Sequence, residues 1–384
     1  MTFRTADVHL PDPYPLYRHY RETDPVHLAA DGTWYLFRHA DVERVLSGRE
    51  YVRGPLPGRI PQDCPHLRRT VGRWMVFMDP PEHSRVRALV AKAFTPRVVE
   101  ELRPRVALLA AELAAGLEHE GGGDLVEAFA APLPVLVISE LLGVPREDRA
   151  WFRARALDLQ QATGARVARR PDGYAVADAA ARELDTYFRA ELARRRAGRT
   201  RDEDDLIAGM LAHSGATDDD VLVGTCVHLL TAGHETTTNL LAKGLLALLA
   251  HGPAGTVPLD ARAVEELIRY DPPVQMVTRL SGQGSVIGGL TVPGGSRLTL
   301  VLGSANRDPA RFPDPDRLDL HRDPGRHCGF GLGIHYCVGA ALARLEGELG
   351  LNALRAAAPG LTVEGVTYAD DLVFHGPARM LVRV

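Results

Sequence analysis

A glycine-rich loop that ends in a cysteine and leads directly into a helix constrains this chain more than any other segment. The loop reads Phe-Gly-Leu-Gly-Ile-His-Tyr-Cys-Val-Gly at residues 330–339, and strong helix formers continue from Val338 to about Ala357. Its first two glycines permit backbone conformations that a side chain would block. Cys337 then lies just before a helix N-terminus, where free N–H groups and the helix dipole favour a thiolate. An isolated cysteine is normally a small buried hydrophobe. In this context, however, Cys337 is a candidate metal ligand.

The second constraint is a long apolar helix with a polar interruption. Asp218 is a suitable cap for a helix from Asp219 to about Leu249. Its middle reads Leu-Thr-Ala-Gly-His-Glu-Thr-Thr at residues 230–237. Glycine inside a helix costs about 1 kcal/mol relative to alanine, and threonine is a weak helix former. Taken alone, the interruption is equally well explained as a tolerated kink or as a functional cluster.

Two further segments place charges at helical spacing. Glu266 and Arg269 are i, i+3 in a helix expected over Asp260 to Tyr270. His83 and Arg87 are i, i+4 at the start of another expected helix. Without other information, Glu266 and Arg269 are a surface pair that contributes little stability. His83 and Arg87 then belong to a solvated amphipathic helix.

The rest of the chain predicts a mainly α fold with a small β portion. Val98 to Leu117 is rich in helix formers, whereas residues 54–73 read as a long loop. Strand-like runs fall within residues 1–50, 277–303 and 361–384.

Bulk composition excludes several classes of protein. A net charge of −4 argues against nucleic-acid binding as the main role. Four cysteines are too few and too scattered for a disulfide scaffold and point to a reducing cytoplasm. The N-terminal sequence contains neither a signal-peptide core nor a transmembrane run, so we expect a cytoplasmic protein without membrane association.

The loop at residues 330–339 resembles the haem-binding loop of the cytochrome P450 family, FGxGxHxCxG. Residues 232–236, Ala-Gly-His-Glu-Thr, resemble the family's oxygen-binding motif, and residues 266–269 match its ExxR motif. The segment at residues 78–87 resembles its C-helix entry. The resemblance runs over nearly the whole chain. It implies a single domain over residues 1–384 with the cytochrome P450 fold, in which haem lies between the long central helix and the cysteine loop.

The resemblance also implies a role for each matched residue. Cys337 is the proximal ligand of the haem iron, and Cys328 falls where the family usually has an apolar residue, so we read Cys328 as packing. Glu235 and Thr236 deliver protons to bound dioxygen, as an acid beside an alcohol is suited to do. The implied haem contacts are His83, Arg87, Ala232, Gly233, Arg279, Phe330, His335, Cys337 and Gly339.

In the family the ExxR pair is buried and holds a third arginine. Arg317, in the segment Pro-Asp-Arg-Leu, is our candidate for that partner of Glu266 and Arg269. Breaking one member would leave an uncompensated buried charge, at a cost of about 3–5 kcal/mol. The expected substrate-pocket residues are Leu229, Val274, Val277 and Phe374.

The implied function is a haem-thiolate monooxygenase with haem b, which oxidises, most simply hydroxylates, a secondary metabolite or its precursor. The resemblance implies that electrons come from NAD(P)H through ferredoxin reductase and ferredoxin. The protein is expected to be a monomer. Its substrate is free or tethered to a carrier protein. Two alternatives stay open. The same haem site can serve oxidative coupling, cyclisation, epoxidation or peroxide-driven oxidation, or the chain can be a haem-free recruitment module.

Two local features lie outside these motifs. The arginine clusters Arg68-Arg69 and Arg194 to Arg196 read as solvated faces, with docking of an acidic redox partner as the alternative. The segment Ala250 to Ala261 is short and holds Gly and Pro, so we expect the helix that the family has there to be truncated or absent.

Overall fold

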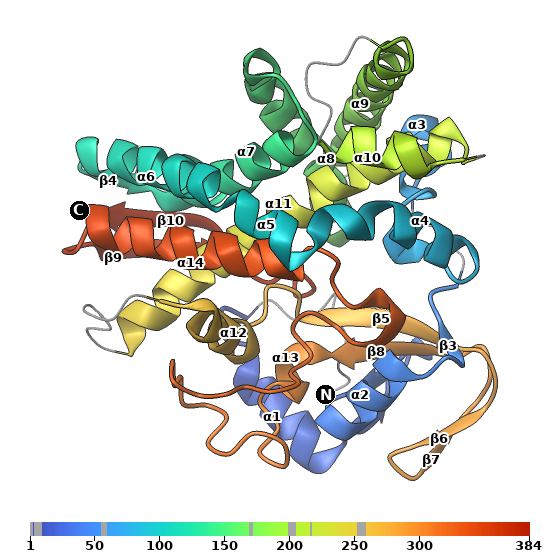
Figure 1. The fold of residues 1–384 in the computed structure, drawn as a ribbon. Helices are drawn as coiled ribbons and strands as arrows, with labels where there is room; N and C mark the ends of the chain where they lie inside the picture. The colour runs from blue at the N-terminus through green and yellow to red at the C-terminus, as the bar shows by residue number, and fades with distance from the viewer. Residues whose placement is uncertain are drawn as a thin grey trace. The chain divides into compact units, whose positions relative to one another are not determined.

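A computed structural model of the chain describes residues 3, 10–54, 60–168, 172–198, 205–215, 217–251 and 259–384, without the side chains of 163–168 (Figure 1). The chain forms two compact units. The first unit comprises Met1–Gly54, Ala110–Ala130 and Thr236–Val384, and the second comprises Pro55–Leu109 and Ala131–Glu235. Within the described ranges, no helix is long and apolar enough to cross a bilayer.

The first unit contains every strand found among the described residues. Its main sheet has the order β1-β2-β8-β5-β3, in which β2 and β8 are parallel and the other pairs antiparallel. A second sheet has the order β4-β10-β9, and β6 and β7 form a hairpin. The strands are β1 (Val26–Leu28), β2 (Trp34–Leu36), β3 (Tyr51–Val52), β4 (Gly122–Asp124), β5 (Met276–Ser281), β6 (Ser285–Ile287), β7 (Leu290–Val292), β8 (Arg297–Val301), β9 (Thr362–Tyr368) and β10 (Pro377–Arg383).

The core of the main sheet anchors the start of the cysteine loop. Leu298 and Leu300 of β8 are fully buried in a cluster that also contains Cys328 and Leu332. The backbone N–H of Cys328 donates to the side chain of Asn306 at 2.7 Å. The loop therefore begins from a fixed position against the sheet. The helices of this unit are α1 (Tyr14–Thr23), α2 (His39–Ser47), α12 (Ala261–Tyr270), α13 (Leu302–Ala305) and α14 (Ala340–Ala357), with short turns η4 (Val126–Ala130) and η6 (Gly333–His335).

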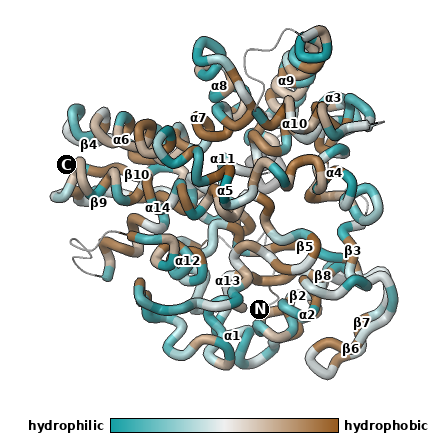
Figure 2. The backbone as a smooth tube through the Cα atoms, in the orientation of Figure 1, coloured by the Kyte–Doolittle hydropathy of each residue, from teal (hydrophilic) through white to brown (hydrophobic). Residues whose placement is uncertain are grey.

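The described residues of the second unit form helices and the segments that connect them, without strands. Its helix α7 (Pro132–Leu141) consists mostly of hydrophobic residues, as its colour in Figure 2 shows, and nearly every one of them is buried. The elements of this unit are α3 (Pro65–Val71), η2 (Met75–Phe77), α4 (Glu82–Ala91), η3 (Lys92–Phe94), α5 (Pro96–Glu101), α7 (Pro132–Leu141), η5 (Arg146–Asp148), α8 (Arg149–Ala168), α9 (Asp172–Arg196) and α10 (Leu206–His213). Helices α6 (Arg103–His119) and α11 (Asp219–Ala250) each contribute residues to both units.

Capping residues set the ends of the predicted helices. Asp218 accepts a hydrogen bond from the N–H of Asp220 at 3.1 Å, and α11 begins at Asp219 as predicted. Asp260 accepts from the N–H of Ala263 at 2.9 Å and caps α12. These two helices are confirmed.

Three expectations about the organisation of the chain need comment. The helix predicted over Val98 to Leu117 is divided into α5 and α6 at Leu102. The loop predicted over residues 54–73 was wrong in part, because α3 forms there from Pro65, whose fixed φ suits a first helical position. The segment where we expected a truncated helix has residues 252–258 outside the described part of the chain.

The arginine cluster at the end of α9 is fully engaged in ion pairs. Arg194 and Arg195 pair with Glu191 at 2.6 Å, and Arg196 pairs with Asp219. This pairing favours a structural or solvated role for the cluster over docking.

Candidate active site

Backbone hydrogen bonds close the loop that carries Cys337. The N–H of Cys337 donates to the carbonyl oxygen of Phe330 at 2.9 Å, and the N–H of Tyr336 donates to Gly333 at 3.1 Å. Gly339 is the N-cap residue of α14. The thiol therefore stands immediately before the N-terminus of this helix, as the sequence predicts.

The glycines of the loop are required by its geometry. Gly331 and Gly333 have φ angles of +67° and +69°, in the left-handed region. A Cβ atom on Gly333 would lie 2.5 Å from the carbonyl oxygen of Leu46. The loop thus packs against the end of α2 more closely than any side chain at residue 333 would allow.

The four cysteines differ in burial, and all of them lie in described parts of the chain. Cys64, Cys226 and Cys328 are buried, whereas Cys337 is partly exposed. Burial raises the pKa of the three buried thiols, that of Cys328 to about 12. Packing explains Cys328, and Cys337 is the cysteine that an outside group can reach.

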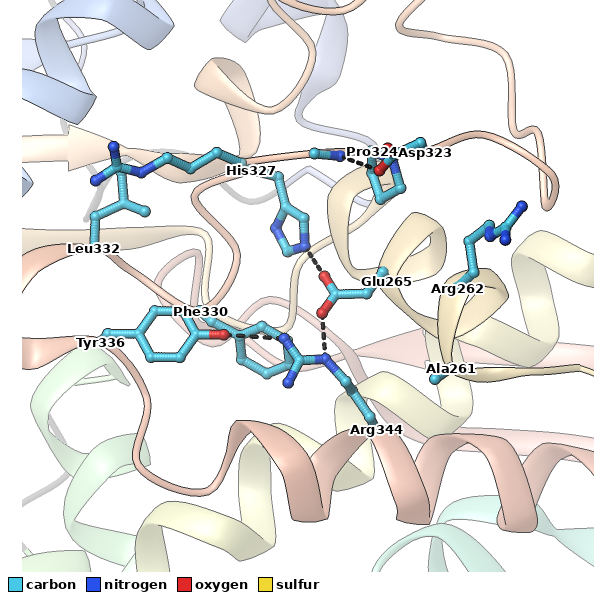
Figure 3. Close-up of a pocket in the computed structure, with 12 residues that line it drawn as sticks. Ala261, Arg262, Glu265, Asp323, Pro324, His327, Phe330, Leu332, Tyr336 and Arg344 are labelled. Carbon is cyan, nitrogen blue, oxygen red and sulfur yellow. Dashed lines mark hydrogen bonds and ion pairs between the residues drawn. The ribbon is translucent and has the colours of Figure 1, made fainter. Parts of the chain in front are cut away.

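A charged network supports the loop from the side of α12 and α14 (Figure 3). Glu265 forms ion pairs with His327 and Arg344. Arg344 also donates to the hydroxyl of Tyr336 at 2.9 Å, and its guanidinium lies 4.7 Å from the ring centroid of Phe330. Burial alone would raise the pKa of Glu265, but the hydrogen bond from His327 and the charge of Arg344 hold that pKa below its ordinary value.

Sequence reasoning missed this network. Its signals are the acidic residue directly before Glu266 and an arginine in the second turn of the helix after Cys337. The network borders a cavity of about 470 Å³ within the first unit. Residues Ala261, Arg262, Glu265, Asp323, Pro324, Gly325, Arg326, His327, Phe330, Leu332, Tyr336 and Arg344 line that cavity.

The predicted ion pair between Glu266 and Arg269 is present and completely buried. Arg269 Nε and Nη2 donate to the two carboxylate oxygens of Glu266 at 2.6 and 2.8 Å. Arg269 Nη1 donates to the carbonyl oxygens of Asn306 and Pro315, each at 2.9 Å. The pair therefore ties α12 to the irregular segment that precedes the cysteine loop.

The third arginine of this cluster is Arg322, so the prediction of Arg317 was wrong. Arg322 Nε donates to Glu266 Oε1 at 3.1 Å, and its side chain is 14% exposed. The side chain of Arg317 is 68% exposed and pairs with Asp319 at 3.1 Å. Only the carbonyl oxygen of Arg317 approaches Arg269, at 3.4 Å. The chain turns between the two arginines and brings the later one back over the carboxylate.

Helix α11 is buried on both sides of its polar interruption, whereas within the interruption only His234 is buried. Residues 221–230 and 237–245 are buried, whereas Ala232 is exposed and Gly233, Glu235 and Thr236 are partly exposed. No atom of the described residues, the helix's own backbone aside, lies within 4 Å of a Cβ built on Gly233. The interruption therefore includes a part of the helix surface that the described residues leave uncovered.

Four of the predicted haem contacts carry an imidazole or a guanidinium group, and each unit contains two of them. His83 is buried and Arg87 is half-buried, both on α4. Arg279 on β5 is 5% exposed and donates to the carbonyl oxygen of Thr278 at 2.9 Å. His335 is partly exposed at the end of η6. All four side chains are at least half removed from water, and a guanidinium so placed can form strong charge-assisted hydrogen bonds to a carboxylate.

The predicted pocket residues have mixed environments. Leu229 on α11 is buried, and Val274 and Val277 are partly buried against the core of the main sheet. Phe374 is partly exposed, and its carbonyl oxygen accepts from Asn239 at 3.0 Å. An accessible thiol at a helix N-terminus, buried cations and an open helix segment together fit a thiolate-ligated haem.

Comparison with known proteins agrees with this site. The family model described as Cytochrome P450 matches residues 255–354. Vitamin D(3) 25-hydroxylase from Pseudonocardia autotrophica is 38% identical, over 97% of this chain and 93% of that protein. Cytochrome P450 monooxygenase PikC from Streptomyces venezuelae is also 38% identical, over 92% of this chain and 85% of that protein.

Solved structures give the same result. The crystal structure of CalO2 has a TM-score of 0.88 at 32% identity and covers 100% of this chain and 98% of that chain. P450BioI, solved in complex with hexadec-9Z-enoic acid ligated Acyl Carrier Protein, has a TM-score of 0.88 at 30% identity, with 97% of each chain covered. Motifs, fold and full-length similarity agree, and this chain belongs to the cytochrome P450 family of oxidoreductases.

Proposed function

We propose that this protein is a haem-thiolate monooxygenase that binds haem b through Cys337 and hydroxylates a small secondary metabolite or its precursor. The observation that carries the proposal is the accessible Cys337 thiol in a loop already closed by hydrogen bonds before α14. When bound, haem supplies the activation of dioxygen. The protein supplies the ligand, the orientation and the control of protons.

The polar interruption of α11 is proposed to move protons and to leave space for ligands beside the helix. Glu235 and Thr236 are consecutive, partly exposed residues of α11, and together they pass protons from water towards the bound substrates. Ala232 and Gly233 carry at most a methyl group, so the helix leaves room beside them. The pairing of an acid with an alcohol at Glu235 and Thr236 counts against peroxide as the required oxidant.

Four polar side chains would hold the haem propionates. They are His83, Arg87, Arg279 and His335, which would form hydrogen bonds to these carboxylates, charge-assisted where the donor is a guanidinium. Their burial supports this role, since a buried arginine or histidine is stabilised by an anionic partner.

Electrons reach the haem from NAD(P)H through ferredoxin reductase and ferredoxin, and the protein acts as a cytoplasmic monomer. The substrate is a secondary metabolite because relatives include PikC and the cyclomarin C epoxidase CymV from Salinispora arenicola. Presentation on a carrier protein is supported by the similarity to P450BioI, which was solved with an acyl carrier protein. The complete cysteine loop and the Glu235–Thr236 pair count against a haem-free recruitment module.

The test is the spectrum of the reduced, carbon monoxide-bound protein. The wild type should give the red-shifted Soret band of thiolate ligation, and Cys337→Ala should lose it. Cys328→Ala is the matched control and should keep the band, because Cys328 is a buried core residue. A band that survives in Cys337→Ala, or that is absent from the wild type, would overturn the proposal.

A further inference from the structure

The segments that enter and leave the cysteine loop contact a single carboxylate on α12 (Figure 3). Glu265 Oε2 contacts Nε2 of His327, which precedes the loop. Glu265 Oε1 contacts Nε of Arg344, in the helix that follows the loop. The side chains of Glu265, His327 and Arg344 are 19%, 3% and 27% exposed, so water competes only partly for these contacts. Each oxygen of the carboxylate therefore serves one end of the loop.

His327 fixes the segment that enters the loop. Its Nδ1 accepts a hydrogen bond from the N–H of Gly329 at 3.0 Å, so the ring proton lies on Nε2 and is donated to Glu265. A Cβ on Gly329 would lie 2.5 Å from Cγ2 of Ile268 and 3.0 Å from Nδ1 of His327. The chain therefore approaches α12 too closely at Gly329 for any side chain, and the imidazole links this approach to the carboxylate.

Arg344 fixes the segment that leaves the loop. Its guanidinium donates to the hydroxyl of Tyr336 at 2.9 Å and lies 4.7 Å from the ring centroid of Phe330. Tyr336 directly precedes Cys337, whose N–H donates to the carbonyl oxygen of Phe330 at 2.9 Å. The arginine thus contacts the side chains of two residues that are bonded to Cys337, one covalently and one through a backbone hydrogen bond.

On the side of this network the loop borders a cavity instead of a packed core. All five side chains of the network line the cavity of about 470 Å³ in the first unit. Polar contacts therefore hold the loop on this side. Consecutive residues of a helix point about 100° apart around its axis. Glu266 thus binds Arg269 and Arg322 in the buried cluster, while the residue before it serves the loop.

The charge of Glu265 allows one side chain to serve both ends of the loop. Both of its partners are hydrogen-bond donors, and an ionised carboxylate has two acceptor oxygens to meet them. A glutamine has one acceptor oxygen and an NH2 group, which would face one of the two donors. Replacing Glu265 by glutamine would therefore release one end of the loop at almost unchanged side-chain volume.

We propose that Glu265 is a positioning residue for the iron ligand. By holding His327 and Arg344 it fixes both ends of the cysteine loop and keeps the sulfur of Cys337 in place for haem. This inference rests on the proposed function, because the position of the thiolate matters only to a protein that binds haem. Without the carboxylate, the loop should open before the rest of the fold unfolds.

The first experiment follows two transitions in one urea titration of the haem-loaded protein. The thiolate Soret band of the reduced, carbon monoxide-bound form reports ligation by Cys337, and far-ultraviolet circular dichroism reports helix content. In Glu265→Gln the Soret midpoint should fall further than the dichroism midpoint, so the gap between them should be wider than in the wild type. A gap no wider than that of the wild type overturns the inference.

Glu140→Gln is the matched control. The side chain of Glu140 is 23% exposed, and its carboxylate accepts from Arg105 at 2.5 Å and from Arg149 at 2.8 Å, all within the second unit. Its loss should lower both midpoints together and leave the gap unchanged, as a purely structural role predicts. A gap that widens equally in Glu140→Gln also overturns the inference.

Arg344→Lys is a second variant, for the case that Glu265→Gln does not fold. A lysine keeps the charge, but one ammonium group cannot reproduce the planar contacts of the guanidinium with Glu265, Tyr336 and the ring of Phe330. The gap should therefore widen in this variant too, and a gap as narrow as that of the wild type then overturns the inference.

A second measurement does not depend on haem. Amide hydrogen exchange of the peptide over residues 327–337 should be about tenfold faster in Glu265→Gln than in the wild type, because a charge-assisted hydrogen bond is lost. The same peptide should exchange at the wild-type rate in Glu140→Gln. A wild type without the thiolate Soret band refutes the proposed function, whereas an unchanged exchange rate in Glu265→Gln refutes the role of Glu265 in holding the loop.

Discussion

The correction at the buried ion cluster leads to a direct comparison of two arginines. Arg322→Ala removes a guanidinium that contacts Glu266 at 3.1 Å, whereas Arg317→Ala removes one that is 68% exposed. The first substitution should destabilise the protein strongly and the second hardly at all. Both are arginine-to-alanine changes in the same irregular segment, so unfolded-state effects are similar.

The contacts of Arg322 set the expected magnitude. Its charge-assisted bond to the completely buried Glu266 contributes about 1.5–3 kcal/mol. Its Nη1 and Nη2 atoms also donate to the carbonyl oxygens of Pro313 at 2.7 Å and Asp314 at 3.1 Å. These two exposed hydrogen bonds together contribute about 1 kcal/mol, because water partly replaces the guanidinium when it is removed. Since Arg269 still compensates the carboxylate, we expect a loss of about 3 kcal/mol. The exposed pair of Arg317 should contribute below about 1 kcal/mol.

Urea unfolding of the haem-loaded protein, followed by circular dichroism, measures both values. The free energy of unfolding should fall with urea concentration at the same slope in all variants, so that differences in the midpoint report differences in stability. Arg322→Lys should fall between wild type and Arg322→Ala, because one ammonium group cannot meet the carboxylate and both carbonyls at once. An equal or larger loss in Arg317→Ala would refute the assignment of Arg322.

Three further outcomes follow from the site. Thr236→Ala should raise the hydrogen peroxide released per NAD(P)H consumed, with Thr237→Ala, at a buried neighbouring position, as the control; equal coupling in wild type and Thr236→Ala would argue against the proton role. Gly333→Ala should reduce the fraction of protein with the thiolate Soret band, because its Cβ would meet the carbonyl of Leu46; full retention of the band would contradict the close packing. The pKa of Glu265 is held below its ordinary value of 4.5, so its stabilising effect is present above that pH and is lost as pH falls through the folded-state pKa. Glu265→Gln should therefore lower stability at neutral pH and flatten the acid limb of a stability profile; an unchanged acid limb would mean that the network does not depend on this charge.

Local chemistry explains which parts of the fold were predictable. The starts of α11 and α12 follow from Asp218 and Asp260, whose side chains cap the first turn wherever the rest of the chain lies. The cysteine loop was also predictable, since its glycines and the following helix are contiguous in sequence. Helix α3 was missed because Gly, Pro and Arg without periodicity resemble a loop, although Pro65 marks its start.

Long-range contacts explain what was not predictable. Arg317 and Arg322 lie in the same irregular segment, where no periodicity applies, so only the folded chain selects between them. The partners of Glu265 come from two segments distant in sequence, His327 and Arg344. The contact between Trp74 and His228 depends on a close backbone approach at Gly224, which hydropathy does not report.

The unequal burial of the four cysteines has a practical consequence for preparing the enzyme. A maleimide dye added to haem-free protein should label Cys337 and spare the three buried thiols, since thiolate character and exposure control alkylation. Iron ligation would protect Cys337 in turn. The labelled fraction of a purified batch then counts the molecules that lack haem, without reference to any extinction coefficient of the pigment.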